Sequence, residues 1–166
     1  MLRPADLHLW YCECYNINMR LLSINIVLST SKQLKKDGWK FDWEKSFGAI
    51  SQKIAYLENE KIQGLVEFEE VPSSLYNMIY RIELAPENIG KNRKINNVAG
   101  TLFAYVAKDS LDAGFEGFVV FDSKTILIDH YVEKYGAQVL FGNRLYFDTK
   151  ASKALIKKYL KGKNNG

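Results

Sequence analysis

The sequence has only two cysteines, two histidines and three prolines among its 166 residues. Cys12 and Cys14 are two residues apart, so a disulfide between them would be strained. A zinc site would need two further ligands, and His8 and the distant His130 do not supply them at a known spacing. With only two histidines in the chain, a catalytic pair of a cysteine nucleophile and a histidine base is also not convincing. We therefore expect structural or incidental thiols and no metal site, with a redox or metal role for the cysteines as the alternative.

The sequence also lacks an apolar run long enough to span a membrane, and its N-terminus lacks a positive segment followed by an apolar core. Hydrophobic residues make up 47% and charged residues 25%, as in soluble globular proteins. A chain of this length can bury an ordinary core in one domain. These properties predict a cytoplasmic protein without membrane contact.

The centre of the chain reads as strand, loop, helix and strand. Apolar and polar residues alternate over 76–84, which is the period of a strand with at least one buried face. A loop over 87–97, rich in Asn, Gly, Lys and Arg, leads to a helical pattern from Val98 to a capping glycine, Gly114. The next apolar run, 118–122, predicts a strand. A helix that starts directly after such a loop offers unpaired N–H groups to an anion.

The start of this helix resembles the pyrophosphate-binding signature of the GNAT superfamily of acyl-CoA N-acyltransferases, Gln/Arg-x-x-Gly-x-Gly/Ala. Lys94 stands at the first position of the signature, Asn97 at the first Gly and Ala99 at the second. Asn tolerates left-handed backbone conformations, and Ala is small enough for a phosphate to approach. The loop after Pro86 is about five residues longer than is usual in the family.

The resemblance covers residues 37–160, where the expected helices and strands follow one another in the same order as in the family. It matches a hairpin over 54–68, a helix over 125–135 and a late strand over 144–148. It implies an α/β (α+β) fold with a mixed, mostly antiparallel central sheet that is flanked by helices and splayed at the acyl-CoA site. We expect a single GNAT-like domain over residues 19–166, preceded by an extension, residues 1–18.

The first part of this domain is less like the family. Alternating apolar residues over 19–28 predict a first strand, the polar segment 29–38 a connection, and residues 42–50 a short helix. Four aromatic residues gather around this helix, where we expect them to cover the core, with a substrate rim as the alternative: Trp39, Phe41, Trp43 and Phe47.

The resemblance also implies how acetyl-CoA is held. Backbone groups of Ile82, Glu83 and Leu84 would pair with the pantetheine arm as an added strand does. The pyrophosphate would be bound by N–H groups at the helix start and by the Thr101 hydroxyl, which gives the set Lys94, Ile95, Asn96, Asn97, Val98, Ala99, Gly100 and Thr101. Side chains of Lys91, Arg93 and Lys94 would screen phosphate charge, unless they are simply solvated.

Two residues are candidates for catalysis. Alternation places Glu83 beside the expected thioester as a general base, with a surface or cross-strand ion pair as the alternative. In the family, a Tyr four residues before the helix-ending Gly protonates the departing thiolate. Val132 holds that position, so Tyr131 is one residue away from it and is either the acid or a buried ring.

We therefore expect an acetyl-CoA-dependent N-acetyltransferase that acts by direct attack in a ternary complex. The alternative is a CoA-binding or regulatory module without transfer, because both family glycines are replaced. The basic tail, residues 150–163, lacks the aromatic interleaving of nucleic-acid sites, which disfavours that class. We expect a primary amine as the acceptor, and the sequence does not distinguish a small molecule, a peptide, a protein lysine and an aminoacyl-tRNA. A homodimer is also compatible with the sequence.

Overall fold

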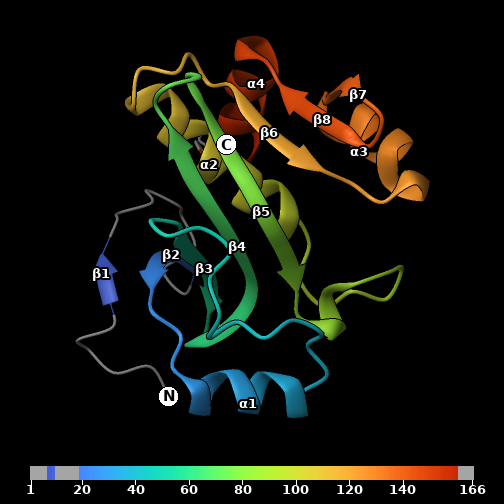
Figure 1. The fold of residues 1–166 in the computed structure, drawn as a ribbon. Coiled ribbons are helices and arrows are strands. Elements are labelled where there is room, and N and C mark those ends of the chain that lie inside the picture. The colour runs from blue at the N-terminus through green and yellow to red at the C-terminus, as the bar shows by residue number, and fades with distance from the viewer. Residues whose placement is uncertain (1–6, 10–18, 161–166) are drawn as a thin grey trace.

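Eight strands of the described part of the chain form one sheet. The computed structural model describes residues 7–9 and 19–160. In chain order, the strands are β1 (Leu7–Leu9), β2 (Met19–Ile24), β3 (Gln52–Glu58), β4 (Lys61–Val71), β5 (Tyr76–Leu84), β6 (Val119–Asp122), β7 (Gln138–Phe141) and β8 (Arg144–Phe147). The sheet order is β1-β2-β3-β4-β5-β6-β8-β7, and only the β5–β6 pair is parallel (Figure 1). The expected mixed, mostly antiparallel sheet is confirmed.

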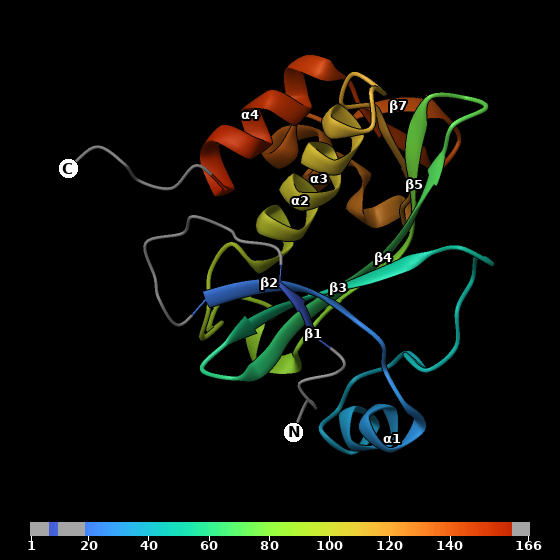
Figure 2. The same cartoon turned by 90° about the vertical axis from the view of Figure 1, so that its left-hand side faces the viewer.

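Helices cover both faces of the sheet. The α-helices are α1 (Leu28–Lys36), α2 (Val98–Asp112), α3 (Ile128–Tyr135) and α4 (Thr149–Tyr159). Helices α2 and α4 lie on one face and α1 lies on the other (Figure 2). Each face has its own apolar core, because alternate residues of a strand point to opposite faces. In β2, for example, Leu21 belongs to the core under α2, and Leu22 belongs to the core under α1.

Helix α2 forms where the sequence predicted it. Asn97 precedes the helix in the left-handed backbone conformation, with φ 69°. An Asn at the first Gly position of the signature was expected to tolerate this conformation. The helix ends at Asp112, and Gly114 follows with φ 84°, which fits a glycine at the helix end. The hairpin is also confirmed, and its two-residue turn places Asn59 and Glu60 at positive φ.

Two predictions for residues 19–50 are wrong. The polar segment 29–38 is mostly helix α1, and Leu28 begins that helix instead of ending the first strand. The segment is so polar that only Leu34 and Ser31 of the helix are buried, which explains why apolar periodicity did not reveal it. The short helix expected over 42–50 does not form, and this segment consists of turns and bends.

The segment set apart as an extension contributes at least one strand. Leu7–Leu9 pairs antiparallel with β2, in the register Leu7↔Ile24 to Leu9↔Leu22. Cys12 and Cys14 lie outside the described residues. Within residues 7–9 and 19–160, no helix has the length and apolar character that crossing a membrane requires.

Close packing at the start of α2 leads to a prediction about stability. A Cβ on Gly100 would lie within 2.7 Å of three ring atoms of Tyr159 on α4. Gly100→Ala should therefore lower the free energy of unfolding by about 1–3 kcal/mol, because overpacking outweighs the better helix propensity of Ala. Denaturant unfolding measures the change.

The sign of this effect should reverse when the ring is removed. In a Tyr159→Ala background, the same Gly100→Ala change should be neutral or stabilising by up to about 1 kcal/mol. Equal losses in both backgrounds would show that the Tyr159 ring is not the cause.

Candidate functional site

The strand β5 loses one of its two neighbours halfway along its length. Its parallel pairing with β6 ends at Ile79↔Phe121, whereas its pairing with β4 continues to Leu84. No described strand pairs with the free edge of β5 beyond Ile79. The sheet is thus splayed where the sequence interpretation expected it to be, and the free edge leaves backbone groups available to an extended ligand.

A β-bulge lies at the point where β5 and β6 separate. The register with β4 steps from Phe68↔Ile79 to Glu67↔Arg81, so that Tyr80 is the extra residue. Tyr80 and Arg81 both bond carboxylates on one face of β4, Glu69 and Glu67 respectively. Beyond the bulge, Ile82 and Leu84 point to the other face.

A cavity of about 550 Å³ lies on that other face. Its walls are Ile82 and Leu84 of β5, the loop 88–97, the first turn of α2, and α3 with the residue before it. Of the residues expected to bind the donor, six line the cavity: Ile82, Leu84, Ile95, Asn97, Val98 and Ala99. Five do not: Glu83, Lys94, Asn96, Gly100 and Thr101.

Two of these five turn toward other parts of the protein. The Thr101 hydroxyl donates to the Asn97 carbonyl at 2.7 Å, and Gly100 faces the Tyr159 ring. The start of α2 has no side-chain cap, so its first N–H groups are not occupied by the Asn97 side chain. The helix start beside Val98 and Ala99 can therefore bind an anion within the cavity.

The cavity wall formed by the loop is fixed to the sheet through Asn88. This buried residue donates from Nδ2 to Gln63 Oε1 at 2.8 Å, and its Oδ1 accepts from Ile95 N at 3.2 Å. The sequence analysis did not identify Asn88 as a residue of the site, because a single Asn in a polar loop gives no sign that it is buried.

Three cations surround the cavity. Lys91 and Arg93 come from the loop, as expected, and Lys134 comes from α3. Burial, then the charges of Arg93 and of Lys158 on α4, lower the pKa of Lys134. Arg93 and Lys134 are therefore close enough to repel each other, and an anion bound between them would relieve that repulsion. Lys134 was missed because the sequence places it in a helix 40 residues after the motif.

Tyr131 lies in the cavity despite its shifted position in the sequence. Its ring packs edge-on against Phe103 at 5.8 Å and Phe121 at 5.5 Å. Val132, which stands four residues before Gly136 where the family has its Tyr, is instead 37% exposed. Tyr131 and Tyr135 are four residues apart on α3, so both side chains lie on the helix face that lines the cavity. This spacing, and not the number of residues between Tyr131 and Gly136, determines where the Tyr131 ring points. Burial raises the pKa of the Tyr131 hydroxyl.

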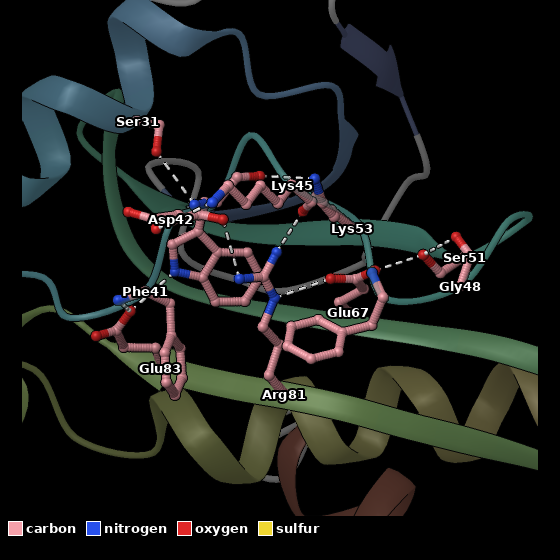
Figure 3. Close-up of polar contacts among 12 residues, drawn as sticks. Ser31, Phe41, Asp42, Lys45, Gly48, Ser51, Lys53, Glu67, Arg81 and Glu83 are labelled. Atoms are coloured by element: carbon pink, nitrogen blue, oxygen red, sulfur yellow. Dashed lines mark hydrogen bonds and ion pairs between the residues drawn. The ribbon is translucent and has the colours of Figure 1, made fainter.

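Glu83 faces away from the cavity and holds the segment 38–51, which we call the strap. Its carboxylate accepts a hydrogen bond from Lys40 N at 2.6 Å. It also accepts from Phe41 N at 3.2 Å and from Trp43 Nε1 at 2.8 Å (Figure 3). The partners of Glu83 are therefore backbone and indole N–H groups, and not the surface or cross-strand cation that was considered. This geometry favours an anchoring role over that of a general base.

A buried ion pair secures the middle of the strap. Arg81 Nε donates to Glu67 Oε1 at 2.8 Å, and its Nη1 donates to the Asp42 carbonyl at 3.1 Å (Figure 3). Glu67 also accepts from Phe47 N at 2.8 Å and from Ser51 Oγ. Burial alone would raise the pKa of Glu67, but these hydrogen bonds together hold it below its usual value. They bind backbone groups that a helix would need, which explains why none forms here.

Trp43 and Lys53 complete this arrangement. Trp43 is fully buried, and its carbonyl accepts from Lys53 Nζ at 2.6 Å. Burial lowers the pKa of Lys53, against the opposing effect of Glu67. Trp39 and Trp43 thus cover the core as expected, whereas Phe41 and Phe47 are exposed and stand on the strap.

Comparisons with known proteins identify the fold. No protein-family model matches the chain, and no curated protein matches it. Among solved structures, mutant forms of the spermidine/spermine N-acetyltransferase SpeG from Vibrio cholerae match with a TM-score of 0.55 and 12% identity, covering 84% of this chain and 98% of that one. The CoA-dependent acyl-homoserine lactone synthase BjaI matches with a TM-score of 0.51 and 13% identity, covering 80% and 76%. The chain therefore has the GNAT fold, and the resemblance inferred from its sequence is confirmed at that level.

Proposed function

We propose, from a fold shared with CoA-dependent acyltransferases, that this protein transfers an acetyl group from acetyl-CoA to a primary amine by direct attack in a ternary complex. The observation that carries the proposal is the cavity at the splay, which combines a free strand edge, a helix start and three cations. These features match the three parts of the donor: an extended amide-bearing arm, a pyrophosphate and further phosphate charge.

The donor would lie along β5 with its thioester near the bulge. Backbone groups of Ile82, Glu83 and Leu84 would bind the arm, and the N–H groups of Asn97, Val98 and Ala99 would bind the pyrophosphate. These contacts use main-chain atoms, so the side chain at 83 is free for another task. The cations Lys91, Arg93 and Lys134 would screen the remaining charge.

Tyr131 would protonate the leaving thiolate. The amine nitrogen forms a bond to the acyl carbon, the carbon–sulfur bond breaks, and the sulfur takes the hydroxyl proton of Tyr131. Burial favours the protonated form of this hydroxyl, so the acid is present at neutral pH. The amine must also lose a proton. Because both Glu83 oxygens accept hydrogen bonds from the strap, loss to solvent fits the geometry better than transfer to Glu83.

A binding or regulatory module with the same fold is the second candidate. The anchoring of Glu83 on the opposite face favours it, because no carboxylate among the described residues lines the cavity. Two measurements separate the candidates: calorimetric titration with acetyl-CoA, and thiol release with a panel of amines. Binding with thiol release supports the enzyme, binding without release for every amine supports the module, and no binding at millimolar acetyl-CoA contradicts both.

Reversing one charge at the cavity should weaken donor binding selectively. Lys134→Glu should lower acetyl-CoA affinity by about tenfold to a hundredfold, because it turns an attraction for phosphate into repulsion near the surface. The loss should shrink at high salt, since exposed charges are screened. Lys153→Glu, an exposed position on α4 outside the cavity, is the matched control. A similar loss in both variants would indicate a general charge effect and not a phosphate contact.

A further inference from the structure

The face of β5 opposite the cavity carries an exposed aromatic pair at the bulge. Phe47 on the strap is 68% exposed, and its ring is stacked on Tyr80 at 6.3 Å with an interplanar angle of 16°. Tyr80 precedes Ile82, a cavity residue, by two positions, so these two residues are about 7 Å apart along the strand. The thioester of the proposed donor would lie near the same bulge. An amine held at this pair would approach the acyl carbon from the side that the donor leaves open.

The exposed ring is fixed by buried polar groups. Phe47 N donates to the fully buried carboxylate of Glu67, and the Arg81 guanidinium lies 5.0 Å from the Phe47 ring. Burying an ion pair such as Arg81–Glu67 gives little net stability, because desolvation offsets the attraction. Here the ion pair fixes the strap over the core and also holds the Phe47 ring in solvent, where that ring itself adds little to the core. An exposed ring that is held rigidly and stacked on a second ring is suited to contact a flat apolar group of a ligand.

Charge around the pair favours a cation. Glu69 accepts the Tyr80 hydroxyl at 2.8 Å and Ile50 N at 3.2 Å, and it is only partly buried. Among the charged side chains of β3, β4 and β5 in this network, Glu67, Glu69 and Glu83 outnumber Arg81 and Lys53. On the strap, Asp42 and Glu44 balance Lys40 and Lys45. The bond to Glu69, then burial, raises the pKa of Tyr80, as expected beside excess negative charge.

Resting on the proposed function, we propose that the acceptor is a primary amine carried on an aromatic or other flat apolar group. The Phe47–Tyr80 pair receives the apolar group, and Glu69 attracts the ammonium group before it is deprotonated. Arg81 is a positioning residue that holds the strap against the bulge. A polyamine, which has several charges and no flat apolar part, fits this surface poorly.

Thiol release with 2-phenylethylamine, ethylamine and spermidine at saturating acetyl-CoA tests the proposal. We expect kcat/KM to be at least tenfold higher for 2-phenylethylamine than for either other amine. Phe47→Ala should lower kcat/KM for 2-phenylethylamine about tenfold and change that for ethylamine by less than threefold. Phe141→Ala, which removes a ring of similar exposure (64%) on β7, is the control and should change neither. Glu69→Gln should raise KM for both 2-phenylethylamine and ethylamine, and equal preference among the amines would overturn the proposal.

A binding measurement keeps this test independent of turnover. Saturation-transfer NMR should detect 2-phenylethylamine on the wild-type protein with CoA present, and the signal should be lost in Phe47→Ala and kept in Phe141→Ala. Absence of a wild-type signal would overturn the acceptor proposal even if acetyl-CoA binds and is hydrolysed or transferred. Absence of acetyl-CoA binding in calorimetry would instead refute the proposed function.

Discussion

Replacing Ala99 by glutamate should abolish acetyl-CoA binding. Ala99 lines the cavity in the first turn of α2, where the unpaired N–H groups would meet the pyrophosphate. A carboxylate there would bring like charges together in a partly desolvated site and would occupy the N–H groups itself. We expect calorimetric affinity to fall by about three powers of ten or more, which corresponds to roughly 4 kcal/mol.

The same substitution at the other end of the helix provides the control. Ala113 is the exposed residue that caps the C-terminal end of α2 and does not line the cavity. Ala113→Glu should leave acetyl-CoA affinity within about twofold of wild type, although a negative charge at a helix C-terminus costs about 0.3–1 kcal/mol of stability. Normal binding by a folded Ala99→Glu variant would place the phosphates elsewhere.

Replacing Tyr131 by phenylalanine should remove catalysis and spare binding. The variant keeps the ring contacts with Phe103 and Phe121 and loses only the proton donor. With an amine that the wild-type enzyme acetylates, we expect kcat to fall by about two to four powers of ten, with acetyl-CoA affinity unchanged.

The pH profile separates a lost acid from a disturbed cavity. An acid acts only while protonated, and the pKa of Tyr131 is raised, so the wild-type rate should fall only above the usual tyrosine range. In Tyr131→Phe, the residual rate should no longer show this fall at high pH, which is the alkaline limb of the pH profile. Tyr135→Phe, a second cavity tyrosine on the same helix face, should keep both the limb and the rate. Equal effects of the two substitutions would rule out a specific role for Tyr131, and catalysis would then depend on positioning and backbone groups.

The sequence allowed the centre of the fold to be predicted because local signals agree there. Strand β5, helix α2 and the α3 region each have clear periodicity, and Gly114 and Gly136 stop their helices at the expected places. The splay also followed from the resemblance, since it depends on the order of elements and not on particular side chains.

The strap and α1 could not be predicted because their structure depends on distant residues. The strap is held by groups on β3, β4 and β5, namely Lys53, Glu67, Arg81 and Glu83, up to 43 residues away along the chain. No local pattern in residues 38–51 encodes these bonds. The same limit applies to the site, where Lys134 joins the cavity only through folding and Glu83 turns to the strap.

The way in which the strap is held bears on which of its positions can vary during evolution. Most of its anchors are main-chain atoms, including the N–H groups of Lys40 and Phe47 and the carbonyls of Asp42 and Trp43. Main-chain anchors do not depend on the identity of the side chain that they carry. Exposed positions such as Phe41 and Phe47 can therefore mutate while the backbone path is conserved, so that new acceptors could be selected without redesign of the donor cavity.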